Sequence, residues 1–153
     1  MEDAAIIIQV LNDLIRVNND RAAGYIRAAA LAKKTDANLT VIFERMADES
    51  RQFVKQLTAE VTALGGKPAV GSTAAGVIYR AWLDLKEGFT GTDHTALLNA
   101  CVAAEEAVQR AYSSALESGA NLSLRKMIAT QKSELNASLD LVKKFRDMRE
   151  VIL

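Results

Sequence analysis

The sequence predicts an all-α protein folded as a four-helix bundle, and three observations support this prediction. The chain has 153 residues, half of them hydrophobic and a quarter charged, so one domain spanning residues 1–153 can bury a substantial core. It contains a single proline, and most of its eight glycines lie where helices should end. Apolar residues recur at spacings of three and four along four long segments, which is the pattern of amphipathic helices.

The first predicted helix covers about residues 3–34, and the middle of its buried face is polar. The residues expected to point inward are Ile7, Val10, Leu11, Leu14, Asn18, Arg21, Tyr25, Ala28 and Ala32. Asn18 and Arg21 therefore interrupt an otherwise apolar face.

The second predicted helix covers residues 39–64 and also carries a polar residue on its buried face. Its apolar positions are Leu39, Ile42, Phe43, Met46, Phe53, Leu57, Val61 and Leu64. Glu49 falls between Met46 and Phe53 on the same face. A carboxylate in that position is costly unless a partner neutralises it.

Local signals predict both ends of this second helix. Asp36 is a good N-cap candidate, and the short link Thr35-Asp36 makes the first two helices antiparallel neighbours. At the other end, Gly65-Gly66 predicts a left-handed cap, and Pro68 cannot continue a helix.

A long connection follows, and it is predicted to carry a short helix between the caps Ser72-Thr73 and Gly88. Its apolar face consists of Val77, Ile78, Ala81, Trp82, Leu85 and Phe89. Tyr79 and Trp82 are expected to pack against the bundle, with a dimer contact as the alternative. A connection of this length lets the second and third long helices run parallel, as in the ferritin-like variant of the four-helix bundle.

The third long helix is predicted from about residue 93 to 117, with Thr92 or Asp93 as its cap. Its inward residues are Leu97, Leu98, Cys101, Ala104, Glu105, Val108, Tyr112 and Ala115. The last helix begins at Asn121 or Ser123. Its face comprises Leu124, Met127, Ile128, Gln131, Leu135, Ser138, Val142 and Phe145, with Glu134 at the edge.

Polar residues from all four long helices are predicted to meet at one level of the core. The set is Asn18, Arg21, Glu49, Glu105, Gln131 and Glu134, with Asp20 and Gln52 at its margins. Two interpretations of this layer remain open, a metal site and a buried hydrogen-bond network, and the network is favoured.

The metal interpretation rests on spacing. Di-metal carboxylate bundles use a Glu from each of two helices and a Glu-x-x-His pair from each of two others. Glu49-x-x-Gln52 and Gln131-x-x-Glu134 keep this spacing without the histidine. The only histidine, His94, lies at a helix start. Without imidazole ligands, iron, manganese or magnesium would be favoured over zinc or copper.

In the network interpretation, Arg21 bridges Glu49 and Glu105, while Asn18 and Gln131 complete the hydrogen bonds. If Glu134 also faces inward, the three carboxylates and one guanidinium leave two negative charges over. A divalent cation, raised pKa values or exposure to solvent would each absorb that charge.

Composition also limits the function. The 19 basic and 19 acidic side chains give a net charge of zero, so we expect no nucleic-acid or membrane partner. The N-terminal segment lacks the features of a signal peptide, which predicts a cytoplasmic protein. Cys101 is the only cysteine, so no internal disulfide is possible, and its apolar surroundings predict a core residue rather than a nucleophile.

Several stretches of the chain resemble an uncharacterised bacterial family of ferritin-like four-helix-bundle proteins. They are Leu11-Asn12-Asp13-Leu14-Ile15, Asn19-Asp20, Gly24-Tyr25, Leu64-Gly65-Gly66-Lys67-Pro68, Trp82-Leu83-Asp84-Leu85-Lys86, and Cys101 with Glu105-Glu106. The resemblance implies a ferritin-like fold and no settled activity. The wider ferritin-like group binds two iron or manganese ions, and its motifs would fall here on Glu49, Gln52, Glu105, Gln131, Glu134 and either Asn18 or Asp20.

Two functional hypotheses follow. The first is a non-catalytic helical bundle, self-associating and with a structural, stress-related role, in which a polar network replaces a degenerate metal site. The second is a protein that binds iron or manganese and has weak redox or storage activity.

Overall fold

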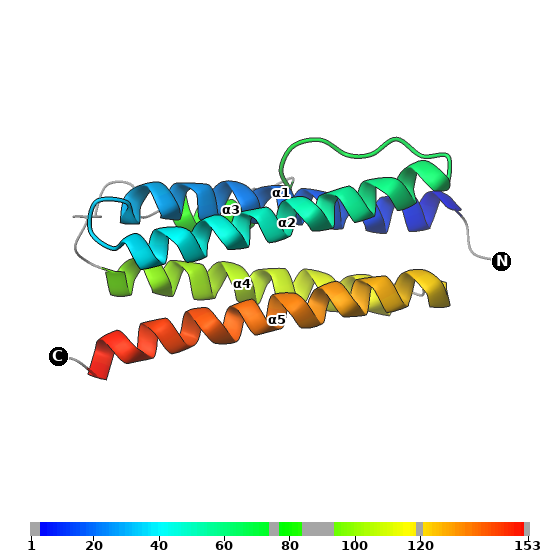
Figure 1. Cartoon of the computed structure of the whole chain (residues 1–153). Helices are drawn as coiled ribbons and strands as arrows, with labels where there is room; N and C mark the ends of the chain where they lie inside the picture. Colours follow the sequence, from blue (N-terminus) through cyan, green and yellow to red (C-terminus); the bar gives the residue numbers. More distant parts are fainter. Residues whose placement is uncertain (1–3, 74–76, 84–93, 119–120, 152–153) are drawn as a thin grey trace.

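The computed structural model describes residues 4–73, 77–83, 94–118 and 121–151. These residues form the helices α1 (Ala4–Ala32), α2 (Ala37–Ala63), α3 (Val77–Leu83), α4 (His94–Glu117) and α5 (Leu122–Val151), with no strand among them. The prediction of an all-α protein is therefore confirmed. Four long helices lie side by side, and the short α3 packs against α1 and α4 (Figure 1).

The chain direction alternates except across the long connection. α1 and α2 run antiparallel, as do α4 and α5, whereas α2 and α4 run in the same direction (Figure 1). This is the order that the long crossover predicts, and it leaves α2 and α5 antiparallel on one face of the bundle. None of the helices in the described ranges combines the length and apolarity needed to span a membrane.

The predicted caps of α2 are confirmed. The Asp36 carboxylate accepts a hydrogen bond from the backbone N–H of Leu39 over 3.1 Å. At the C-terminal end, Gly65 adopts a φ of 80°, a left-handed conformation that favours glycine, and the Gly66 N–H donates to the Val61 carbonyl. Asn121 caps α5 by accepting from the Leu124 N–H.

The short helix of the crossover is present where it was predicted. Among the described residues it covers Val77–Leu83, and the predicted end at Gly88 lies outside them. Thr73, a predicted cap, donates its hydroxyl proton to Asp20 on α1 over 2.6 Å. Leu85, Phe89 and the predicted caps of the third long helix lie outside the described residues.

All five helices contribute to one buried cluster of hydrophobic side chains. Trp82 of α3 is completely buried, and Tyr79 packs against the same cluster, so the predicted packing of these aromatic residues on the bundle is confirmed. A Cβ atom on Gly24 would overlap the six-membered ring of Trp82. The glycine therefore allows α3 to lie directly on α1.

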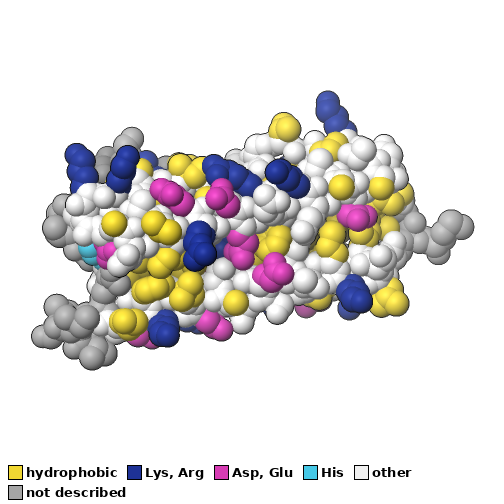
Figure 2. Space-filling model, viewed as in Figure 1, with side chains coloured by type: hydrophobic (Ala, Val, Ile, Leu, Met, Phe, Trp, Pro, Cys, Tyr) yellow, Lys and Arg dark blue, Asp and Glu magenta, His cyan; other side chains and the backbone are white. Residues whose placement is uncertain are grey.

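The two long seams of the bundle differ. α3 contacts both α1 and α4 and covers the part of their seam beside Gly24, while a cavity of about 140 Å³ opens further along it, between Val17 and Ala111. No helix in the described ranges lies over the seam between α2 and α5, and two cavities lined by both helices, of about 310 and 210 Å³, open along it. Figure 2 shows hydrophobic side chains exposed along this face, between charged side chains on either side.

Candidate functional site

Arg21 is the centre of the candidate site. Its side chain is completely buried midway along α1, and it contacts carboxylates from two other helices. Its Nε and Nη2 atoms donate to the two carboxylate oxygens of Glu105 on α4, over 2.6 and 2.9 Å. Nη2 also lies 2.9 Å from Oε1 of Glu49 on α2. One guanidinium therefore joins three helices, as the network interpretation predicts.

The remaining nitrogen of Arg21 is held by α2. Its Nη1 donates to the backbone carbonyl of Met46 over 3.0 Å and to Oγ of Ser50 over 2.9 Å. Burial disfavours the charged form, but the attraction and hydrogen bonds of Glu105, together with the attraction of Tyr25 and Glu49, outweigh it and raise the pKa of Arg21 above its ordinary value. The guanidinium also stacks over the Tyr25 ring, 5.0 Å from its centroid. The buried residue is thus a permanent cation with all its nitrogens in contact with acceptors.

A chain of hydrogen bonds runs from Arg21 towards α5. The Ser50 hydroxyl donates to Oδ1 of Asn18 over 2.9 Å, and Nδ2 of Asn18 donates to the Tyr112 hydroxyl over 2.8 Å. Tyr112 donates to Oε1 of Gln131 over 2.7 Å. This chain links α1, α2, α4 and α5 through side chains that are almost wholly buried.

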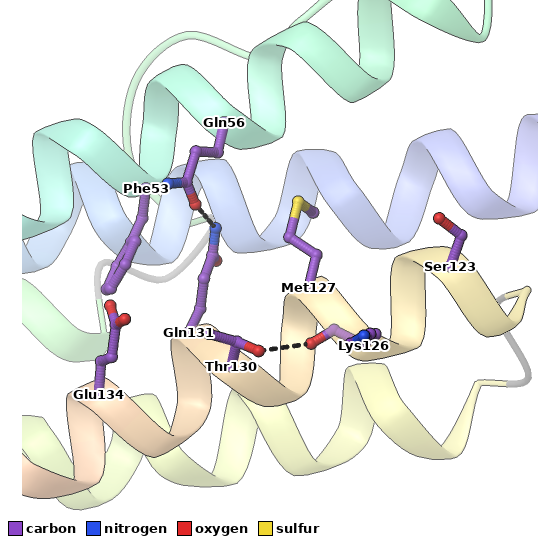
Figure 3. A pocket seen from close by; sticks show the side chains of 8 residues that line it. All are labelled: Phe53, Gln56, Ser123, Lys126, Met127, Thr130, Gln131 and Glu134. Atoms are coloured by element: carbon purple, nitrogen blue, oxygen red, sulfur yellow. Dashed lines mark hydrogen bonds between the residues drawn. The ribbon is translucent and has the colours of Figure 1, made fainter.

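The direction of this chain follows from Arg21. Because arginine can only donate, Ser50 must accept from it and donate onward, and the same holds at each following hydroxyl or amide. Burial raises the pKa of Tyr112, so its hydroxyl keeps the proton that it donates to Gln131. The series of hydrogen bonds ends at the surface, where Nε2 of Gln131 donates to Oε1 of Gln56 over 2.9 Å (Figure 3).

The two carboxylates bound to Arg21 lie in different environments. The Glu105 side chain is 1 % exposed and binds the guanidinium through both oxygens. The Glu49 side chain is 26 % exposed, and its Oε1 also accepts a hydrogen bond from the Ser138 hydroxyl on α5 over 2.9 Å. Partial burial raises the pKa of Glu49 despite the attraction of Arg21. Glu49 is therefore the less well compensated of the two.

Three of the predicted site residues lie away from this centre. Asp20 is buried, but its carboxylate faces the crossover, where it accepts hydrogen bonds from the N–H and hydroxyl of Thr73. Gln52 is exposed on α2, and Glu134 is exposed on α5 beside Phe53 (Figure 3). The inward placement of Glu134 is thus wrong. A residue three positions along a helix is rotated by about 60° from its partner, enough to move it from a buried face to its edge.

The sequence interpretation missed Ser50, which is fully buried and contacts both Arg21 and Asn18. Its spacing held the signal, since it lies four residues after Met46 and three before Phe53. Ser50 occupies the centre of the buried face, and Glu49 its border. Tyr112 was placed correctly on the inward face, but its role as the link between Asn18 and Gln131 was not predicted.

The described side chains do not assemble the ligand set of a di-metal centre. The guanidinium of Arg21 contacts both inward carboxylates, so it stands where a metal ion would bind them. No group of three or more His, Cys, Asp or Glu side chains in the described ranges is arranged to hold a metal. His94 lies at the end of the bundle, with Nε2 2.8 Å from the Thr35 hydroxyl.

An aromatic cluster covers the Arg21–Glu105 pair on the α3 side. Tyr25 packs against Trp82 with ring centroids 5.1 Å apart, and the Trp82 indole N–H donates to Sγ of Cys101 over 3.3 Å. Burial raises the pKa of the Cys101 thiol to about 12. The thiol is therefore protonated and covered, and the prediction that Cys101 lies in the core is confirmed.

A comparison with known protein families finds a match for the chain. Residues 6–118 match the model of a domain of unknown function, DUF2383. The chain belongs to this family. The DUF2383 match spans α1 to α4 and stops before α5, the helix that supplies Gln131 and Ser138 to the network. No curated protein matches the chain.

Proposed function

We propose that this DUF2383 protein is a non-catalytic helical bundle in which a buried arginine takes the place that a metal pair has in ferritin-like proteins. In this proposal the polar residues of the core hold four helices in register. The protein then acts through its surface, in keeping with a structural, stress-related role. Self-association is part of the same proposal.

One observation carries the proposal, namely that a single guanidinium binds both inward carboxylates. Arg21 pairs with Glu105 through two oxygens and with Glu49 through one. A divalent cation could reach these oxygens only by displacing a permanent positive charge, which would then be left buried without a partner. Arg21 thus already supplies a cation to both inward carboxylates.

A polar network of this kind favours one arrangement of the helices over others. Shifting α2 or α5 along the bundle would separate Ser50 from Asn18, or Gln131 from Tyr112. Each separation would leave a buried polar group unsatisfied, at a cost of about 1–3 kcal/mol. An apolar core with the same volume would lack this penalty against misaligned helices.

Metal analysis of protein purified without chelator tests the proposal. We expect less than stoichiometric iron, manganese or magnesium, and a melting temperature that does not change when these ions are added. A ligand that binds only the folded state must raise the melting temperature. Stoichiometric iron or manganese that is lost in Glu49→Ala and Glu105→Ala would refute the proposal.

That result would instead support the second candidate, an iron- or manganese-binding protein with weak redox or storage activity. The observation favouring it is that Glu49 and Glu105, from different helices, lie within reach of one cation. The variant Arg21→Gln separates the candidates further, because it frees both carboxylates. Metal binding that appears only in Arg21→Gln would support the first candidate and show that the arginine blocks the centre.

A further inference from the structure

We propose that the smaller cavity between α2 and α5 binds the primary ammonium group of a small aliphatic molecule, with Glu49 as its counter-ion. The cavity has a volume of about 210 Å³ and opens on the seam between α2 and α5. Its lining residues are Ile42, Arg45, Met46, Glu49, Ser138 and Leu141. This inference does not depend on the metal question.

The charges of the buried cluster leave one negative charge over. Arg21 supplies one positive charge, while Glu49 and Glu105 supply one negative charge each. The other side chains bonded to the cluster are neutral, namely Ser50, Asn18, Tyr112, Gln131 and Ser138. Since Glu105 is sealed in the core and Glu49 is 26 % exposed, the surplus charge of the buried cluster lies on Glu49 at the cavity, which Arg45 also lines.

Glu49 is held in place with one oxygen still available. Its Oε1 is occupied by Nη2 of Arg21 and the hydroxyl of Ser138. No described residue donates a hydrogen bond to Oε2. A carboxylate that is oriented by two neighbours and partly removed from water favours a bound cation more strongly than a free surface carboxylate does.

The walls of the cavity suit an aliphatic body. Ile42, Met46 and Leu141 line it, and Leu141 is 39 % exposed. An alkyl chain could cover these side chains while its ammonium group donates to Glu49. A hydrated metal ion would gain nothing from such walls, which favours an organic cation.

Arg45 should determine whether the cavity prefers a free aliphatic amine or an aliphatic amino acid. It lines the cavity one turn before Glu49 and forms no ion pair with a described residue. It would repel a simple amine but attract the carboxylate of an amino acid whose ammonium group binds Glu49. Free aliphatic amines and aliphatic amino acids therefore share the ammonium site and differ in their response to Arg45.

The larger cavity on the same seam provides a contrast. Lys126 and Glu134 both line it, and its buried polar group, Gln131, is neutral and already bonded to Gln56 and Tyr112. The buried cluster therefore presents a neutral amide at this second cavity and a carboxylate at the first. We expect ammonium compounds to distinguish the two cavities.

Titration of the full chain with n-butylammonium chloride, followed by NMR, tests the proposal. Sodium chloride at equal ionic strength and 1-butanol serve as ligand controls for charge and for the apolar body. We expect saturable shifts confined to α2 near residues 42–49 and α5 near residues 138–141, with a Kd on the order of 1 mM. Butanol should bind at least about tenfold more weakly, because it lacks the charge-assisted hydrogen bond.

Matched variants complete the experiment. Glu49→Gln should weaken butylammonium binding at least about tenfold, whereas Glu44→Gln, the same change on another face of α2, should leave it unchanged. Leu141→Phe fills part of the cavity without altering its charge and should also weaken binding. If Glu49→Gln alters the fold, Leu141→Phe still tests whether the ligand occupies this cavity.

A parallel titration with leucine shows whether the bound ammonium group belongs to an amino acid or to a free amine. Tighter binding of leucine than of butylammonium, reversed in Arg45→Gln, would support the proposal with an amino acid as ligand. Tighter binding of butylammonium would support it with a free amine. The proposal fails if neither compound gives saturable shifts, if Glu49→Gln binds as well as the parent, or if binding appears only in Arg45→Gln.

Discussion

The two seams of the bundle give the two partners of Arg21 different properties. At the α1–α4 seam, Glu105 is 1 % exposed, and the aromatic cluster of Tyr25 and Trp82 lies over the pair. At the α2–α5 seam, Glu49 is 26 % exposed beside an open cavity. Glu105 thus forms a buried ion pair that solvent does not reach, whereas the carboxylate of Glu49 is accessible from the cavity. Because both residues are glutamates, the difference comes from their surroundings rather than from the residue type.

Removal of Arg21 should have the largest effect, because it affects both seams at once. Arg21→Ala leaves Glu105 as a buried charge without a partner, so we expect a loss of about 3–5 kcal/mol in the free energy of unfolding. Urea denaturation at neutral pH measures this. The control is Arg16→Ala, whose exposed ion pair with Asp13 should contribute less than about 1 kcal/mol. An Arg21→Ala variant as stable as the control would refute the network interpretation.

The covered seam can be opened by adding one methyl group. Gly24→Ala should destabilise the protein by about 1–3 kcal/mol, because the new Cβ overlaps the Trp82 ring. This would occur although alanine favours a helix over glycine by about 1 kcal/mol. Thermal melts of Gly24→Ala and of Gly24→Ala with Trp82→Leu measure the effect. If the smaller side chain at position 82 restores none of the stability, the packing of α3 on Gly24 is not its cause.

Replacing each carboxylate in turn tests the comparison directly. Glu105→Leu leaves Arg21 with its main partner removed, and we expect a loss of several kcal/mol, about 3 or more. Glu49→Leu should change stability by less than about 1 kcal/mol and can be stabilising, because the Glu49 carboxylate is poorly compensated. Denaturation midpoints and slopes of the two variants give both values. Equal losses would mean that the two seams do not differ in electrostatic environment.

The smallest effect concerns reactivity rather than stability. Since the pKa of Cys101 is raised to about 12, the folded thiol stays protonated at pH 8, and only the thiolate reacts. We expect a thiol reagent to modify the native chain at least about 100-fold more slowly than the urea-unfolded chain, whose thiol has the usual pKa of about 8.5. The same shift makes stability depend on pH. As the pH rises above about 8.5, the thiol ionises in the unfolded chain but not in the folded one, so the free energy of unfolding falls. Rapid native labelling would mean that the α3 cover opens readily.

Much of the fold could be predicted because its signals are local. The caps at Asp36 and Gly65 depend on a few neighbouring residues, and the short link between the first two helices leaves them little choice but an antiparallel arrangement. The contact of Arg21 with Glu49 and Glu105 was also predicted, because an unpaired charge on a buried face needs a partner. The inward position of Glu134 was wrong, since a difference of about 60° around a helix separates core from surface.

The sequence by itself determined that the chain is helical, where most of its helices begin and end, and that several of them place a polar residue on a buried face. These properties depend on backbone preferences and on the spacing of apolar side chains, both of which act over a few residues. Only the tertiary structure decided that Ser50 rather than Glu49 occupies the centre, that Tyr112 links Asn18 to Gln131, and that Glu105 is sealed in the core while Glu49 borders a cavity. Those features depend on how helices distant in sequence rotate and pack against one another, which no local pattern specifies.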